Sequence, residues 1–132
     1  MAGLDTNVLV RWLVDDDAAQ STLAAERFRT AARQQQPLFV PVTVTLELEW
    51  VLRSRYHFAK ADIQRAFNAL LETRELLFQS EDAIEQALHA WRNGNADFAD
   101  CLHASLCRTA GHAPLLSFDA RAARQPGFEW LR

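Results

Sequence analysis

The chain has 132 residues, enough for one ordinary domain that buries roughly two-thirds of the surface its unfolded form exposes. Hydrophobic residues make up 49% and charged residues 23%, which excludes a disordered chain, and no apolar run is long enough to span a membrane. The net charge of -3 argues against a protein that coats nucleic acid by bulk charge. We therefore predict a single domain over residues 1–132, located in the cytoplasm, with no secretory leader and no membrane partner.

Hydrophobic periodicity predicts strands that alternate with helices along the chain. The expected strands are residues 2–5, 38–41, 75–79, 113–119 and, as a short last one, 128–131. The expected helices are residues 7–14, 18–33, 42–56, 59–73, 80–94 and 96–111, of which 42–56 also fits a strand in its first half. Because strands separated by helices need crossover connections, we expect an α/β fold with a mostly parallel sheet covered on both sides by helices.

Acidic side chains stand where two of these strands end. Asp5 ends the first expected strand and Asp119 ends the fourth. In an open parallel sheet, binding sites form beyond the carboxyl ends of the strands, so both acids are expected at the same edge. Taken alone, an Asp before a helical pattern is more often a helix cap than a ligand. The other acids must therefore decide between the two interpretations.

Helical geometry separates two neighbouring glutamates in the helix expected at 42–56. With about 100° per residue, Glu47 lies at the edge of the apolar stripe formed by Val44, Leu48 and Val51. Glu49 points away from that stripe. We therefore expect Glu47 to face inward, toward the edge that carries Asp5, and Glu49 to face water.

Asp97 and Asp100 open the helix that precedes the fourth strand, and their spacing of three places them on one helix face. The five acids together repel one another unless divalent cations lie between them. Ligand sets made only of oxygen select Mg²⁺ or Mn²⁺, and such cations activate water for attack on a phosphodiester. The acids therefore predict metal-dependent hydrolysis of a phosphodiester.

Other site chemistries fit the sequence less well. Cys101 and Cys107 lie six residues apart in one helical pattern, too far apart to bridge, so we expect free thiols. The four histidines show no zinc-binding spacing. Residues 15–26 space acids like a calcium-binding EF-hand loop, but Gln20 stands where that loop requires glycine. A phosphotransfer receiver domain would need a strand-ending Asp in mid-chain and a lysine after the fourth strand, and neither is found.

Four segments, in order, resemble PIN domains. They read LDTNVLVRWLVDDD, TLELEWVLRSRY, ADFADCLHASL, and LLSFDARAAR followed by PGFEWL. Together they cover nearly the whole chain, and they are most similar to the VapC-type toxins of bacterial toxin-antitoxin pairs. The resemblance implies the PIN fold, an α/β/α sandwich with a central, mostly parallel sheet. It also implies an endoribonuclease that depends on Mg²⁺ or Mn²⁺.

The resemblance assigns roles residue by residue. The positions that match catalytic and metal-binding acids are Asp5, Glu47, Asp100 and Asp119, with Asp97 as an extra metal ligand. The positions that match supporting polar residues are Thr6, Asn7 and Ser117. His103 stands where similar helices usually carry an aliphatic residue, so we expect a half-buried structural histidine rather than a catalytic one.

The resemblance also implies partners. They are an RNA substrate, a VapB-type antitoxin protein that covers the acidic groove, and a second copy of the chain in a homodimer. The apolar helices around Trp12 and Trp50 are the candidate surfaces for these protein contacts. The alternative is a catalytically inactive PIN-like module that binds RNA or protein. The two readings differ in whether the acids come within metal-bridging distance, about 3.5–4 Å between two cations.

Overall fold

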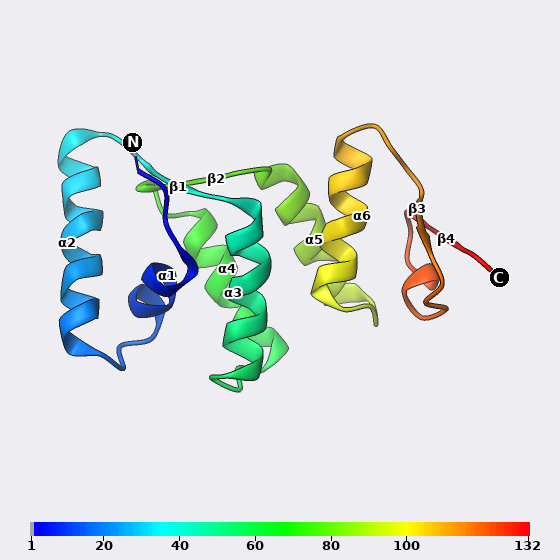
Figure 1. The fold of residues 1–132 in the computed structure, drawn as a ribbon, viewed down its shortest axis with the longest axis horizontal. Coiled ribbons are helices and arrows are strands. Elements are labelled where there is room, and N and C mark those ends of the chain that lie inside the picture. The colour runs from blue at the N-terminus through cyan, green and yellow to red at the C-terminus, as the bar shows by residue number, and fades with distance from the viewer. Residues whose placement is uncertain (1) are drawn as a thin grey trace. The chain divides into compact units, whose positions relative to one another are not determined.

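The structure is a computed structural model that describes residues 2–132 (Figure 1). Its elements are α1 (Thr6–Leu13), α2 (Ala18–Gln34), β1 (Leu38–Val40), α3 (Val42–Ser54), α4 (Lys60–Leu71), β2 (Leu76–Phe78), α5 (Glu81–Asn93), α6 (Phe98–Thr109), β3 (Leu115–Ser117), the 3-10 helix η1 (Ala122–Arg124) and β4 (Phe128–Trp130). The predicted α/β class is confirmed, and so are the six predicted helices and the last four predicted strands.

The chain divides between Gln79 and Ser80 into two compact units, called here the N-terminal unit and the C-terminal unit. The predicted single domain over 1–132 stays a prediction. Within residues 2–132 the strands form two parallel pairs, β1 with β2 and β3 with β4, where the sequence suggested one sheet. No helix in this described part of the chain is long and apolar enough to cross a membrane.

In the N-terminal unit, β1 has a parallel neighbour on each side. Its register with β2 runs from Leu38 opposite Leu76 to Val40 opposite Phe78. On the other side, the predicted first strand is reduced to an isolated bridge between Gly3 and Phe39. The pairing does not continue past this bridge because Asp5, two residues after Gly3, is already the N-cap of α1.

The helices of this unit pack around apolar side chains spaced at helical intervals. Leu48 and Leu52 of α3, and Ile63 and Phe67 of α4, are all fully buried. Indole and phenyl rings join α1 to α2, since Trp12 stacks on Phe28 with ring centroids 4.1 Å apart.

In the C-terminal unit, α5 and α6 lie side by side (Figure 1), and the rings of Trp91 and Phe98 meet edge to face at 5.4 Å. Gly94 ends α5, as predicted. Ser80 precedes α5 as predicted, but it makes no capping hydrogen bond because its backbone is left-handed, with φ 57°, rather than extended. Cys107 of this unit is a free thiol, as expected.

The expectations that Glu47 faces inward and that Glu49 faces water are both wrong, because Glu47 is exposed and Glu49 is buried. Glu49 is only 3% exposed, and its carboxylate forms an ion pair with Arg53, with Nε 2.8 Å from Oε2. Arg53 lies one helical turn later, so the pair forms within α3 itself. The apolar stripe of Val44, Leu48 and Val51 is buried as predicted, but α3 is covered over a wider arc than this stripe.

Glu49→Gln should therefore destabilise the fold. The substitution removes a charge-assisted hydrogen bond from a buried position, which should lower the free energy of unfolding by about 1–2 kcal/mol. Chemical denaturation measures this directly. The matched control is Glu26→Gln on α2, an exposed glutamate whose replacement should change the free energy by less than about 0.5 kcal/mol. Equal stabilities for both variants would show that the Glu49–Arg53 pair contributes nothing.

Candidate functional site

The N-terminal unit brings Asp5 to the head of α3 through backbone pairing. Phe39 of β1 accepts a hydrogen bond from Leu4 N and donates one to Ala2 O, both at 2.8 Å. The two segments run parallel, so their carboxyl ends meet at one edge. Asp5 follows one of these ends, and α3, which carries Glu47, begins just after the other.

Thr6 joins the two acids. Its side chain is 2% exposed, and its hydroxyl donates a hydrogen bond to Glu47 Oε1. Its backbone N–H donates to Asp5 Oδ1 at 2.8 Å. Both carboxylates are exposed, and each uses one oxygen for this contact. The second oxygen of each can therefore bind a cation without disturbing Thr6.

The contact to Thr6 N also makes Asp5 the N-cap of α1. The two interpretations that the sequence leaves open for Asp5, cap and ligand, are therefore compatible. The capping hydrogen bond uses Oδ1 and fixes the orientation of the carboxylate. The position of Oδ2 is therefore fixed as well.

The C-terminal unit gathers the other three acids. Asp97 is the residue before α6, Asp100 lies in its first turn, and Asp119 follows β3. The pKa of Asp100 is raised, first by burial of the carboxyl and then by the negative charges of Asp97 and Asp119, while His103 and a backbone hydrogen bond lower it. The carboxylates of Asp97 and Asp119 therefore lie close enough to repel that of Asp100.

Asp119 is held by the turn that follows β3. Its backbone N–H donates to Ser117 Oγ at 3.0 Å. Its Oδ1 accepts from Arg121 N at 2.9 Å and from Ala122 N at 3.3 Å, so the carboxylate is held at the turn that leads into η1. As with Asp5, one carboxylate oxygen fixes the side chain and the other can bind a ligand.

The expectation of a half-buried His103 is wrong, since this side chain is exposed. It lies three residues after Asp100 on α6, and its charge opposes the rise in the Asp100 pKa. The i, i+3 spacing was the signal in the sequence, because residues so spaced share a helix face. A histidine on that face has water and an acid as neighbours rather than the packed core.

Sequence reasoning missed Gln79. Its side-chain Oε1 accepts a hydrogen bond from Val42 N, the first residue of α3, at 2.9 Å. Its backbone N–H donates to Val40 O, also at 2.9 Å, which continues the pairing beyond β2. The signal in the sequence was Pro41, the N-cap residue of α3. Proline has no side-chain hydrogen-bond acceptor, so the free backbone N–H groups at the start of α3 need an acceptor from another part of the chain.

The predicted site residues thus form two groups in two units. The first contains Asp5, Thr6 and Glu47, and the second contains Asp97, Asp100, Ser117 and Asp119. Asn7 is exposed and lines a hollow of about 290 Å³ along α1 and α2, beside Val8 and Arg11. Over residues 2–132 no three His, Cys, Asp or Glu side chains stand together as a metal-binding group.

The donor atoms of both groups nevertheless fit a hard divalent cation. All of them are carboxylate or hydroxyl oxygens, the ligands of Mg²⁺, Mn²⁺ and Ca²⁺, and neither group contains a thiol. The pKa of Asp100 is raised first by burial of its carboxyl group and then by the negative charges of Asp97 and Asp119, which oppose its ionisation. A bound cation would remove this repulsion.

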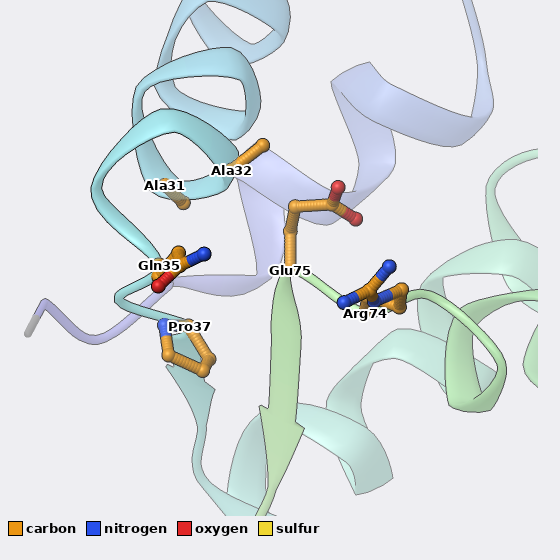
Figure 2. A pocket seen from close by; sticks show the side chains of 6 residues that line it. All are labelled: Ala31, Ala32, Gln35, Pro37, Arg74 and Glu75. Atoms are coloured by element: carbon orange, nitrogen blue, oxygen red, sulfur yellow. The ribbon is translucent and has the colours of Figure 1, made fainter.

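A hollow of the N-terminal unit that is larger than the one beside Asn7 lies elsewhere. It has a volume of about 600 Å³ and is found where α2 ends and β1 and β2 begin, so it is at the amino ends of the strands. Figure 2 shows the side chains that line it, Ala31, Ala32, Gln35, Pro37, Arg74 and Glu75. None of the predicted site residues is among them. The volume of a hollow is therefore no guide to where the acid groups lie in this protein.

Two comparisons bear on these groups. The PIN domain family matches residues 3–127, a range that includes both units and both acid groups. The chain is also 25% identical, over 118 residues, to a VapC ribonuclease of Aquifex aeolicus (strain VF5); the match covers 89% of this chain and 87% of that protein. Because the family match extends over nearly the whole chain, the protein belongs to the PIN domain family.

Proposed function

We propose that the protein is a metal-dependent endoribonuclease that hydrolyses RNA phosphodiester bonds. The observation that carries the proposal is the pair of acid groups, each placed at the carboxyl end of parallel strands and each tied down through one oxygen. The PIN family match and the similarity to a VapC ribonuclease support the same chemistry.

The acids of both groups supply the ligands in this proposal. They are Asp5, Glu47, Asp97, Asp100 and Asp119. When bound, Mg²⁺ or Mn²⁺ lowers the pKa of a water molecule and neutralises the charge that develops at phosphorus. Oxygen donors alone favour these cations over zinc, which prefers nitrogen and sulfur.

The chain's own residues orient these ligands. Thr6 fixes the Glu47 carboxylate through its hydroxyl and the Asp5 carboxylate through its backbone N–H. Ser117 fixes the turn that presents Asp119. Asn7, next to Thr6, is proposed to support the site from the start of α1. Such fixed ligands reduce the reorganisation that the reaction requires.

We further propose that the protein is the toxin of a type II toxin-antitoxin pair in the cytoplasm. It would act as a homodimer and bind a VapB-type antitoxin. Trp12 and Trp50 support a protein interface, because their side chains are 42% and 50% exposed on α1 and α3. Exposed tryptophans are frequent at protein interfaces.

The alternative is a PIN domain that has lost activity and only binds RNA or protein. It predicts that the acids are dispensable, whereas the endoribonuclease requires them. The buried hydroxyl of Thr6 favours the endoribonuclease, because it donates its hydrogen bond to Glu47, an exposed acid that the packing of α3 does not require.

Purified protein should cleave RNA only when Mg²⁺ or Mn²⁺ is added, and excess chelator should abolish cleavage. Glu47→Gln keeps the side-chain volume but removes a ligand charge, so the cleavage rate should fall about a hundredfold or more. The matched control is Glu49→Gln, which should keep its rate per folded molecule. Undiminished cleavage in chelator would reject the metal mechanism, and full activity of Glu47→Gln would reject the ligand assignment.

Expression of the protein alone should arrest growth, and co-expression of its antitoxin should relieve the arrest. Light scattering should give the mass of a dimer, and replacing Trp12 or Trp50 with serine should shift it toward the monomer, since each buried tryptophan contributes substantially to an interface. A monomer that neither arrests growth nor copurifies with a small partner would contradict the toxin assignment. It would not contradict the nuclease activity, which the experiment with metal and chelator tests separately.

A further inference from the structure

Phe118 is the most exposed large hydrophobic residue of residues 2–132, at 81%. It stands between Ser117 and Asp119, directly beside an acid of the second group. Its backbone is fixed on both sides. The Phe118 carbonyl accepts a hydrogen bond from Trp130 Nε1 at 3.3 Å, and the next residue, Asp119, donates from its N–H to Ser117 Oγ at 3.0 Å. The structure therefore presents an aromatic ring to solvent from an anchored turn.

A second aromatic ring and positive charge lie next to this turn. Trp130 of β4 pairs in register with Ser117 and is 42% exposed. The guanidinium of Arg132 lies over the Trp130 ring, 4.5 Å from its centroid. Arg121 is exposed two residues after Asp119. Although the whole chain has a net charge of -3, residues 118–132 carry three arginines against two acids.

Aromatic rings combined with arginines are the usual means of binding single-stranded nucleic acid. Bases stack on the rings, and the guanidinium groups contact phosphates. A phenyl ring cannot bind the phosphate itself. Because Phe118 and Asp119 are consecutive, their Cα atoms are about 3.8 Å apart, so a base on the ring would belong to a nucleotide close to a phosphate that a cation holds at Asp119.

We propose that Phe118 stacks on a base of single-stranded RNA, next to the phosphodiester that is cleaved. This inference rests on the proposed ribonuclease function and assigns to it a substrate-positioning residue. Stacking holds the strand in register without reading hydrogen bonds, so it tolerates every base. It favours purines modestly, because their larger rings stack more strongly.

The first test compares variants of the full chain on a short single-stranded RNA with Mg²⁺. Phe118→Ala should raise KM about tenfold, with a smaller change in kcat, whereas Phe118→Trp should retain the wild-type KM. The matched control is Leu116→Ala, two residues earlier on β3. Leu116 is 55% exposed and apolar but has no ring, so its replacement should leave KM unchanged.

The second test uses substrates with one abasic nucleotide at each position in turn. One abasic position next to the cut should weaken cleavage by the wild-type protein but not by Phe118→Ala, because the stacking partner is already missing. Wild-type cleavage that is unaffected by Phe118→Ala would overturn the inference. If Phe118→Ala and Leu116→Ala both change the oligomeric mass while KM stays constant, the surface binds protein rather than RNA, and the inference is again overturned.

A binding measurement separates this inference from the proposed function. In excess chelator, RNA that carries 2-aminopurine next to the cut position should lose fluorescence when the wild-type protein binds, and should not do so with Phe118→Ala. Such quenching in a protein that never cleaves RNA would support the stacking site and reject the nuclease. Normal cleavage without any difference in quenching would support the nuclease and reject the stacking site.

Discussion

The N-terminal acid group depends on the parallel pairing of Phe39. This residue hydrogen-bonds to Ala2 and Leu4 on one side, and it lies opposite Leu77 of β2 on the other. Parallel pairing brings the carboxyl ends of neighbouring segments to one edge. For this reason Asp5 and Glu47, more than forty residues apart in sequence, both accept hydrogen bonds from the buried Thr6. Without this pairing, Asp5 would be an ordinary helix cap.

Both groups use the same arrangement. One oxygen of an acid accepts a hydrogen bond from the chain, as Asp5 does from Thr6 N and Asp119 does from Arg121 N. The acids keep their orientation although their negative charges are crowded. The pKa of Asp100 is raised first by burial and then by the charges of Asp97 and Asp119. A site that tolerates such repulsion is suited to a cation that removes it, and the proposed chemistry follows from this electrostatic balance.

Much of the fold could be predicted because its signals are local. Apolar periodicity located the helices, and Asp5 and Asp119 were placed at strand ends by the position of each acid in its run. The exposure of Glu49 was predicted wrongly, because one apolar stripe does not show how wide an arc of α3 is covered by the rest of the protein. Gln79 was missed because its partner, Val42, lies far away in sequence, and the exposure of His103 depends on what packs beside α6. Such contacts are set by tertiary structure, which periodicity does not contain.

The central claim is that each of the two acid groups binds a divalent cation. Paramagnetic broadening by substoichiometric Mn²⁺, read from the backbone amide signals of the wild-type protein by NMR, tests it without reference to activity. The account predicts that the signals of Thr6 and of Asp119 both disappear at low Mn²⁺ concentrations, while those of exposed acids elsewhere, such as Glu26, remain. Broadening of only one of these two signals, or of neither, would contradict it.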